Sequence, residues 1–503
     1  MEYILSSAEM KDCDEKTTSQ YGIPAMILME RAALETAKII MEEYGTDIYV
    51  GIVAGSGNNG GDGIAIARIL KEYGVAVEIL MAGNCEHFTQ LTKMQMEIAT
   101  KLGIPVRYLF DNFSYDVIVD ALLGVGLSRN VEGNYKKVID LINESGAKVV
   151  AVDIPSGIDA STGFILGNAV KADITVTYGF KKYGHVMYPG TSYCGRVDCV
   201  SIGIPQELVQ QEKNKAIIFD EYDLQLPFRT PDGNKGSFGK VFLIAGSKNM
   251  GGACQLAAAS AFRIGAGMVK IFTSVYNKDS LLRKVPEAMI SCYEEGDNRL
   301  TPEDKETIEQ GMKWADVVAI GPGISTSEKA VAILTYLLRI NTKPLVMDAD
   351  ALNILSEQPQ LMKFFEVNGE AAKFETIMTP HLGEFARLIK HPIAEIKNNL
   401  VMYARSFTHK YQVTLVCKDA RTVVTRRGCV PYINTSGNSG MATAGAGDVL
   451  TGIIAGLLAQ GMDAHEAAVM GTFAHGMAGD IAKSNTSAYY IMSQDIIQAI
   501  RYL

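Results

Sequence analysis

Short apolar runs alternate with helical segments along most of the chain, and this alternation occurs in two blocks. In the first block, the apolar runs are residues 49–55, 75–83, 116–124, 148–157 and 172–179. In the second block, they are residues 240–247, 267–274, 315–323, 344–352, 376–381 and 413–425. Continuous apolar strands separated by helices are typical of parallel sheets with both faces covered. The alternation therefore predicts an α/β fold with two domains, each built on its own sheet.

The segment between the two blocks is polar and charged. Residues 206–235 contain no clear strand, so we expect a linker near residues 206–222. This places one domain at residues 1–210 and the other at residues 222–503. A chain of 503 residues is long enough for two large hydrophobic cores.

The charge balance and the cysteines restrict the partners and the compartment that we expect. The chain has 47 Lys and Arg against 56 Asp and Glu, a net charge of −9, so neither nucleic acid nor an anionic membrane is an expected partner. The N-terminal sequence MEYILSSAEMKDCDEK has no basic region followed by an apolar core, so we expect no signal peptide. The eight cysteines form no C-x-x-C pair, which favours free thiols and a reducing cytoplasm.

A glycine-rich loop follows the first apolar run and precedes a helix, at residues 55–63. A loop in this position lets backbone N–H groups approach a phosphate at the helix N-terminus. Gly55, Gly57 and Gly60 match the spacing of a dinucleotide-binding loop, and Glu78 follows about 20 residues later. A tight strand-to-helix turn without any ligand is the alternative interpretation.

Two departures argue against an ordinary dinucleotide-binding dehydrogenase. The loop carries the polar side chains of Asn58, Asn59 and Asp62, where such a loop is normally small and apolar. Glu78 lies inside an apolar run rather than at its end. The polar side chains suggest that the loop binds its ligand through side-chain oxygens as well as backbone N–H groups.

Polar residues also end two later apolar runs of the first block. Asp120 ends DVIVD and precedes a glycine-rich turn, and Asp153 ends KVVAVD and precedes IPSGID. The carboxyl ends of parallel strands are where α/β proteins form their sites, although an Asp there can also simply cap a turn. Asn59, Asp120 and the Ser156 hydroxyl offer hard oxygen ligands, which suit an alkali or alkaline-earth cation better than zinc.

The motifs LMERA, GSGNNGGDG, DALLGVG and DIPSGID resemble the N-terminal domain of the NAD(P)H-hydrate epimerase family, over about residues 1–205. The resemblance implies K⁺ bound by Asn59, Asp120 and Ser156. It also implies contacts with the damaged nucleotides NADHX and NADPHX, the hydrated forms of NADH and NADPH, from Asn58, Asn59, Gly60, Gly61, Asp62, Gly124, Val125, Gly126, Leu127, Ser128, Arg129, Asn130 and Asp153. Asp153 is the candidate acid/base, because inverting a hydrated carbon needs proton transfers. The same domain also occurs as a binding module in RNA-decay scaffold proteins.

The most informative C-terminal segment is NTSGNSGMATAGAGDVLTG, in which Gly445 to Asp448 open a long helix. Consecutive N–H groups at a helix N-terminus can stabilise a negatively charged phosphoryl group, and Asp448 is placed to take a proton from an attacking hydroxyl. A simple Asp cap is the alternative. Lys418 to Thr422 are predicted to form a hairpin turn. His381, between a strand and a helix, is by itself more often structural than functional.

The motifs KGSFGKVFLIAGS, GGACQLAAASAFRIGAGMV, GPG, DADALN, TPHLGEFARL and GNSGMATAGAGDVLTG resemble, in this order, the NAD(P)H-hydrate dehydratase branch of the ribokinase-like superfamily. The resemblance covers about residues 222–503 and implies phosphorylation of the hydrate by ADP or ATP with Mg²⁺, followed by loss of phosphate. Asp448 would be the base. Contacts with the adenine nucleotide are implied for Lys418, Asp419, Ala420, Arg421, Thr422 and Gly447. Contacts with the hydrate are implied for Ala253, Gly323, His381 and Asp448. Ala446 departs from the family, which usually has Thr there.

Together these observations predict a bifunctional repair enzyme, with a Rossmann-like doubly wound sheet in the N-terminal domain and a ribokinase-like α/β sandwich in the C-terminal domain. The first domain would epimerise R and S forms of NAD(P)HX, and the second would dehydrate the S form. The fusion of both domains resembles the microbial, ADP-using type, and we expect a homo-oligomer. One alternative is a ribokinase-like kinase for a small alcohol or vitamin precursor with an N-terminal regulatory domain. Another is a nucleotide-binding scaffold without turnover.

Overall fold

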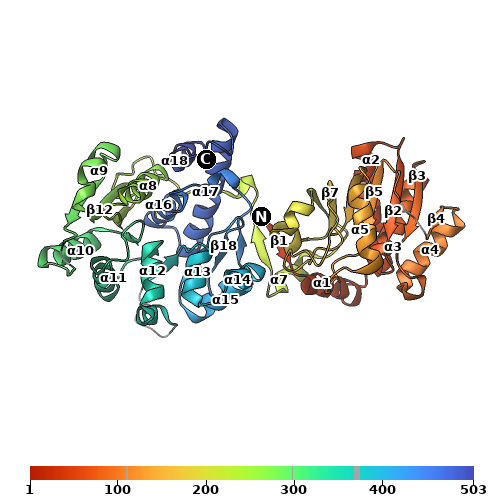
Figure 1. Cartoon of the computed structure of the whole chain (residues 1–503), viewed down its shortest axis with the longest axis horizontal. Helices are drawn as coiled ribbons and strands as arrows, with labels where there is room; N and C mark the ends of the chain where they lie inside the picture. Colours follow the sequence, from red (N-terminus) through yellow and green to blue (C-terminus); the bar gives the residue numbers. More distant parts are fainter. Residues whose placement is uncertain (109–111, 297, 368–373) are drawn as a thin grey trace. The chain divides into compact units, whose positions relative to one another are not determined.

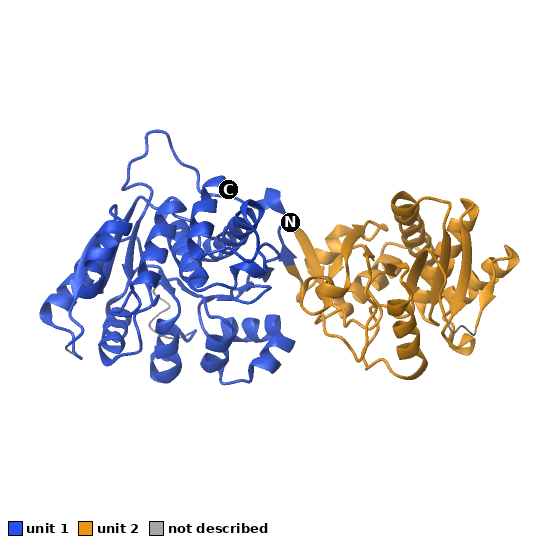
Figure 2. Ribbon diagram, turned by 45° about the horizontal axis from the view of Figure 1, so that its top comes forward, with its two compact units in different colours: residues 1, 217–503 blue, residues 2–216 orange. Residues whose placement is uncertain are grey.

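The computed structural model contains two compact units, which Figure 2 shows in different colours. One unit comprises Glu2–Ala216, and the other comprises Ile217–Leu503 with Met1. The structure describes residues 1–108, 112–296, 298–367 and 374–503. Among these residues, no helix combines the length and the apolar character that a membrane span needs.

The boundary between the units falls inside the segment for which the sequence predicted a linker. That segment is not free of regular structure, because it contains the helix α7 (Gln206–Gln211) and the strand β10 (Ala216–Ile218). Leu208 and Val209 of α7 are buried, which ties the helix to the first unit. A strand of three residues is too short for its apolar pattern to be visible in a charged segment.

The N-terminal unit is built on a parallel sheet with the strand order β4-β3-β2-β5-β6-β7-β9. The strands are β2 (Tyr49–Ala54), β3 (Ala76–Met81), β4 (Val106–Arg107), β5 (Val117–Ala121), β6 (Lys148–Val152), β7 (Ile174–Tyr178) and β9 (Arg196–Val200). The order reverses between β2 and β5, as in Rossmann-like folds, and ligands bind at the carboxyl ends of the strands beside such a reversal. The predicted doubly wound sheet is confirmed.

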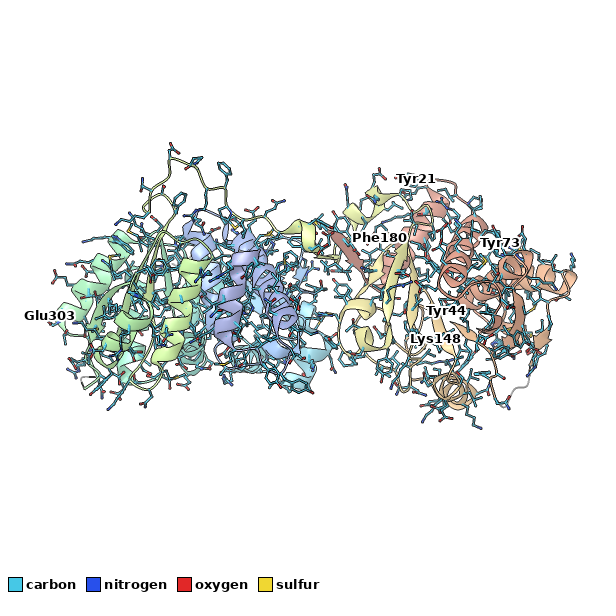
Figure 3. The ribbon with its side chains drawn as sticks, turned by 90° about the horizontal axis from the view of Figure 1, so that it is seen from above. Tyr21, Tyr44, Tyr73, Lys148, Phe180 and Glu303 are labelled. Atoms are coloured by element: carbon cyan, nitrogen blue, oxygen red, sulfur yellow. The ribbon has the colours of Figure 1, made fainter. Side chains whose placement is uncertain are left out.

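Helices cover both faces of this sheet. They are α1 (Ser7–Ser19), α2 (Ala25–Tyr44), α3 (Asn58–Glu72), α4 (Gln90–Lys101) and α5 (Gly133–Glu144), labelled in Figure 1. Ile52 of β2 is buried in the cluster that contains α2 and α3, and its neighbour Val53 is buried in the cluster that contains α5. Both faces of the sheet are therefore dry, which explains why its strands read as continuous apolar runs. Polar and aromatic side chains such as Tyr21 and Tyr73 lie on the outside of the unit (Figure 3).

A small strand pair positions the first helix. β1 (Glu2–Leu5) pairs in parallel with β8 (Lys181–Lys182), so that Leu5 is opposite Lys182. The helix α1 begins directly after β1, with Ser6 as its N-cap, and Ser6 and Glu9 form a capping box. As a result, α1 lies close to Lys182. The short helix α6 (Tyr183–Val186) begins directly after Lys182.

The C-terminal unit is also built on a mostly parallel sheet whose strand order reverses. Its strands run in the order β13-β12-β11-β14-β15-β16-β17-β18-β19-β10, parallel from β13 to β17, with an antiparallel hairpin from β17 to β18. The strands are β11 (Lys240–Ile244), β12 (Met268–Ser274), β13 (Met289–Tyr293), β14 (Val317–Ile320), β15 (Leu345–Met347), β16 (Thr376–Met378), β17 (Thr414–Cys417), β18 (Val423–Thr425) and β19 (Tyr432–Ile433). The order reverses between β11 and β14. The two-domain α/β architecture predicted from the sequence is confirmed.

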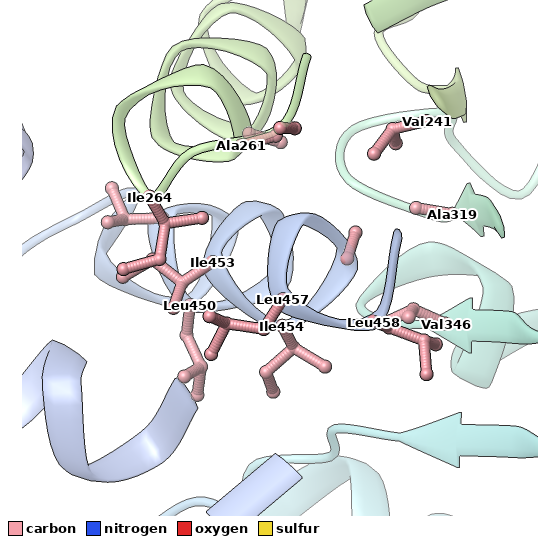
Figure 4. Close-up of a cluster of buried hydrophobic side chains, with 14 of the residues drawn as sticks. Val241, Ala261, Ile264, Ala319, Val346, Leu450, Ile453, Ile454, Leu457 and Leu458 are labelled. Carbon is pink, nitrogen blue, oxygen red and sulfur yellow. The ribbon is translucent and has the colours of Figure 1, made fainter. Parts of the chain in front are cut away.

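The helices of this unit include α8 (Gly251–Arg263), α9 (Lys278–Lys284), α10 (Pro302–Trp314), α11 (Glu328–Ile340), α12 (Asp350–Glu357), α13 (Leu382–Ile389), α14 (Ile393–Asn398), α15 (Leu400–Lys410), α16 (Ala446–Ala459), α17 (Ala464–Asn485) and α18 (Ser493–Ala499). Figure 4 shows α16 packed between α8 and the sheet, with Ile453 near Ile264. Gly452 allows this close approach, since a Cβ there would lie 2.1 Å from the carbonyl oxygen of Ala257 in α8. The glycines of α16 therefore bring its N-terminus to a fixed place against α8.

Candidate functional site

The glycine loop between β2 and α3 is held by backbone-to-backbone contacts. A Cβ on Gly60 would lie 1.9 Å from the carbonyl oxygen of Gly55, and a Cβ on Gly55 would lie 2.0 Å from that of Leu122. The first contact folds the loop on itself, and the second packs it against the turn after β5. Gly57 is the N-cap of α3 and makes no side-chain cap, so the N–H groups of the first helical turn face the loop.

The three residues with predicted cation-binding oxygens lie around this contact. The Asp120 carboxylate accepts hydrogen bonds from the Ser156 backbone N–H at 2.8 Å and from the Ser156 hydroxyl at 2.6 Å. Burial raises the pKa of Asp120 to about 6, although the bonds from Ser156 act in the opposite direction. The Asn59 amide nitrogen is buried without a hydrogen-bond partner among the described residues, and a Cβ on Gly124 would lie 3.0 Å from the amide oxygen. A buried amide nitrogen without a partner is a free hydrogen-bond donor, so it indicates a missing acceptor beside the glycine loop.

A cavity of about 600 Å³ opens above the carboxyl ends of β2 and β5. Many of the predicted substrate contacts line it: Asn58, Asn59, Asp62, Gly124, Val125, Gly126, Leu127, Ser128, Arg129 and Asp153. Gly60 and Gly61 do not line it, because both are buried against the loop and α2. Asn130 is exposed and also lies outside the lining. The first helices, α1 and α2, complete the wall.

Asp153 follows β6 in a strained conformation, with a φ of 65°. Its carboxylate accepts a hydrogen bond from Lys182 at 2.5 Å and another from the Thr177 hydroxyl at 3.1 Å. Burial raises the pKa of Asp153, but the charge and hydrogen bond of Lys182 outweigh it, so the pKa lies below its usual range. The carboxylate predicted as acid/base is therefore ionised, which suits a base and not an acid.

The backbone of Asp153 is held by His185. The backbone N–H of Lys182 donates to Nδ1 of His185, which leaves Nε2 to donate to the Asp153 carbonyl oxygen at 2.8 Å. Burial lowers the pKa of His185 to about 3, so the ring is neutral, as this pair of bonds requires. The sequence did not indicate Lys182 or His185, because both lie about 30 residues after Asp153 in a separate segment.

Glu78 has no part in this site. Its carboxylate accepts hydrogen bonds from the hydroxyls of Tyr115 at 2.6 Å and Tyr49 at 3.1 Å, and forms an ion pair with Arg107. A dinucleotide-binding fold would use an acidic residue at the strand end to bind a ribose. The contacts of Glu78 instead hold neighbouring strands together, in agreement with the sequence argument against a dehydrogenase.

In the C-terminal unit, an ion pair joins two strand ends. Asp348, directly after β15, accepts hydrogen bonds from Lys418 at 2.7 Å and from the Thr451 hydroxyl of α16 at 2.7 Å. Lys418 directly follows β17, and a Cβ on Gly447 would lie 3.1 Å from its amine. The predicted nucleotide contacts Lys418 and Gly447 thus lie together, and their partners Asp348 and Thr451 lie in quoted motifs but were given no role from the sequence.

Asp448 lies in the first turn of α16, beside this ion pair. Burial, followed by the charge of Asp348, raises the pKa of Asp448 to about 7, while Lys418 acts in the opposite direction. The N-cap of the helix is Gly445, with a φ of 88°, and it makes no side-chain cap. The N-terminus of α16 therefore offers free N–H groups to an anion, next to a carboxyl group that titrates near neutral pH.

The other predicted residues of this unit lie either against α8 or around Lys418. Gly323, after β14, packs against α8, and a Cβ there would lie 3.0 Å from that of Ala253. His381 caps α13 by accepting a hydrogen bond from Gly383 at 3.0 Å, and its backbone lies next to Lys418 in the sheet. The rest of the predicted nucleotide segment forms the hairpin turn between β17 and β18: Asp419, Ala420, Arg421 and Thr422.

Two family models match the chain. The one described as NAD(P)H-hydrate dehydratase covers residues 241–501, and the one described as YjeF-related protein N-terminus covers residues 25–184. A bifunctional NAD(P)H-hydrate repair enzyme of Thermofilum pendens is 36% identical, over 94% of this chain and 91% of its own length. This chain belongs to the bifunctional NAD(P)H-hydrate repair enzyme family.

Further relatives agree with this membership. The NAD(P)H-hydrate repair enzyme of Escherichia coli is 32% identical, over 95% of this chain and 90% of its own length. Among solved structures, a ribokinase-like superfamily protein of Enterococcus faecalis is 30% identical with a TM-score of 0.50, over 57% of this chain and 94% of that protein. The predicted ribokinase-like fold and the predicted family are confirmed. The alternatives, a small-alcohol kinase and a scaffold without turnover, give way to a repair enzyme with two active units.

Proposed function

We propose that the two units carry the two activities of a hydrate repair enzyme. The N-terminal unit interconverts the R and S forms of NADHX and NADPHX, and the C-terminal unit dehydrates the S form with ADP or ATP. The observation that carries the first assignment is the cavity lined by the glycine loop, the 124–129 loop and Asp153. The second assignment rests on the uncapped N-terminus of α16, with Asp448 in its first turn and Lys418 beside it.

The proposed cation of the epimerase unit is K⁺, bound by Asn59, Asp120 and Ser156. The amide, carboxylate and hydroxyl oxygens of these residues are hard ligands, and the Asp120 carboxylate is fully buried. K⁺ would supply positive charge beside the buried Asp120 carboxylate and link the glycine loop to the turn after β5.

In the dehydratase unit, we propose that Asp448 takes the proton from the hydroxyl of the hydrate as this oxygen attacks the terminal phosphoryl group. The N–H groups at the start of α16 and the Lys418 ammonium stabilise the charge that develops on that group. The C–O bond to the phosphorylated oxygen then breaks with phosphate as the leaving group, and the adjacent ring carbon loses a proton, which restores the double bond. The described residues include no cluster of three His, Cys, Asp or Glu for a metal, so Mg²⁺ would bind mainly through phosphates and water.

The remaining expected contacts of this unit stay proposals. Lys418 and Gly447, with the hairpin turn, would bind the adenine nucleotide. Ala253, Gly323 and His381 would contact the hydrate. A cytoplasmic location and a homo-oligomeric state also remain predictions, as does a preference for ADP over ATP.

The epimerase assignment is tested by following R/S exchange on a separated form of NADHX by chromatography, in K⁺ and in Na⁺, after subtraction of the spontaneous rate. We expect exchange to require enzyme and to be faster in K⁺. Ser156→Ala should weaken the apparent K⁺ affinity by about 10-fold or more. Ser145→Ala is the matched control, because Ser145 caps α5 outside the cavity. No exchange by the wild-type enzyme, or unchanged K⁺ dependence in Ser156→Ala, would contradict the assignment.

A further inference from the structure

Two carboxyl groups on different helices face the N-terminal cavity together with Asp153. They are Asp14 on α1 and Asp62 on α3. Within the part of the chain that the structure describes, neither makes a hydrogen bond or an ion pair. The third carboxyl group, that of Asp153, is held by Lys182. Half-buried carboxyl groups without partners are costly to keep, which points to a role in the cavity.

The surroundings give these carboxyl groups different protonation states. Burial raises the pKa of Asp14 to about 6, with Lys182 acting against it and Asp153 and Glu15 adding to it. Burial, followed by the charges of Asp153 and Asp14, raises the pKa of Asp62 well above its usual range. Asp62 is therefore biased towards its protonated form and Asp153 towards its ionised form, and the pKa of Asp14, about 6, lies between the two directions. Groups whose environments separate their pKa values in this way are the usual acid and base of an enzyme site.

The substrate chemistry needs one acid and one base. In the hydrate, water has added to a ring double bond, so one carbon bears both a hydroxyl and the ring nitrogen. Inversion at that carbon can proceed without an oxidant or reductant. The hydroxyl oxygen takes a proton, the C–O bond breaks with its electron pair leaving on water, and the nitrogen lone pair forms a C=N bond. Water then adds to the opposite face, the C=N pair returns to nitrogen, and the new oxygen loses a proton.

We propose that Asp14 is the catalytic residue that gives the proton to the departing hydroxyl, and that Asp62 is a neutral carboxyl group that donates a hydrogen bond beside it. The proton of the entering water goes to the Asp153 carboxylate. Water bound to a C=N carbon is strongly acidic, so a carboxylate held by Lys182 is basic enough for this step. Asp14 then takes up a proton from solvent, and Asp153 releases its proton to solvent. This inference rests on the proposed epimerase function.

The test replaces Asp14 with Asn, which keeps the shape of the side chain but cannot give a carboxyl proton. We expect Asp14→Asn to lose about 100-fold or more in the rate of R/S exchange. Dehydration of separated S form should stay at the wild-type rate, because it uses the other unit. The matched control is Asp12→Asn on the same helix, since Asp12 lies outside the cavity and is paired with Lys16. This control should keep exchange within about twofold of wild type.

The pH profile distinguishes an acid from a structural residue. The charged groups that act on Asp14 are Asp62, Asp153, Lys182 and, on its own helix, Glu15, and Lys11 and Arg129 line the same cavity. The wild-type kcat/KM for exchange should fall as the pH rises through about 6, because the acid loses its proton. Asp14→Asn should lack this decline, and Asp14→Glu should restore part of the rate together with the decline.

Each result decides between the claims. If the wild-type enzyme shows no exchange, the proposed function fails. If it does, but Asp14→Asn stays within about threefold of wild type, the assignment of Asp14 is overturned. If Asp14→Asn does not fold, the pH profile of kcat/KM for Asp14→Glu is the test. The assignment is overturned if kcat/KM of this variant does not decline at high pH.

Discussion

Asp448 is the residue that we propose as the base of the C-terminal unit. Its carboxyl group lies in the first turn of α16, whose N-cap makes no side-chain cap, and it is close to the Asp348–Lys418 pair. Asn at this position keeps the size of the side chain but cannot accept the proton. We expect Asp448→Asn to lower dehydration by about 100- to 10,000-fold and to leave R/S exchange unchanged. Both rates are measured on the same purified variant.

The pH dependence of dehydration checks the same assignment. The pKa of Asp448 is raised to about 7, and a base acts in its ionised form. The rate should therefore rise with pH up to about 7 and level off above it, with about a tenfold loss per pH unit below. A dehydration rate that stays flat between pH 5.5 and 8 would contradict Asp448 as the base. Loss of both activities in a folded Asp448→Asn would contradict a base that acts in one unit only.

At the residue scale, the motifs indicated the residues that stand beside glycines at strand ends, such as Asn59, Asp120 and Asp448. They did not indicate Lys182, and they gave no role to Asp348, although it begins the DADALN motif. Lys182 reaches Asp153 across 29 residues of sequence, and Lys418 reaches Asp348 across 70. A single charged side chain in a polar stretch carries no local pattern, so only the fold reveals which carboxylate it neutralises.

At the scale of elements, the glycines act through distances between backbones. Gly60 is in contact with the carbonyl oxygen of Gly55, whereas a Cβ on Gly57 would meet no atom within 4 Å. We expect Gly60→Ala to displace the loop and to abolish R/S exchange, with dehydration retained. Gly57→Ala, three residues away, is the matched control and should fold like wild type. Exchange and the thermal unfolding of each variant are the measurements.

Two results would contradict this explanation of the glycine loop. If Gly60→Ala keeps its exchange rate and unfolding temperature, the 1.9 Å approach between Gly60 and Gly55 is not what shapes the loop. Equal damage from both substitutions would mean that flexibility, rather than close packing, is what the loop requires.

The elements were predicted well where they are buried and poorly where they are short. Strands such as β5 and β14 are apolar on both faces, so their runs were visible in the sequence. β10 has only three residues in a charged segment, and the predicted linker therefore contained a strand and the helix α7. The role of α1 in the cavity wall was also not visible, because it depends on the pairing of Leu5 with Lys182.

At the scale of the whole molecule, the side chains proposed for each reaction belong to one unit. The cavity of the N-terminal unit is lined by residues of that unit alone, and Asp348, Lys418, Thr451 and Asp448 all belong to the other. One unit makes both forms of the hydrate available, and the other consumes one of them. The account therefore predicts two independent activities that act in sequence on one substrate.

The most direct measurement follows the absorbance of regenerated NADH when the wild-type enzyme meets a mixture of R and S NADHX, with K⁺, Mg²⁺ and ADP or ATP. The account predicts complete conversion of the mixture, at a rate well above spontaneous exchange. Conversion that stops at the S fraction would show that the N-terminal unit does not epimerise the hydrate. No conversion with either nucleotide would contradict the dehydratase as well.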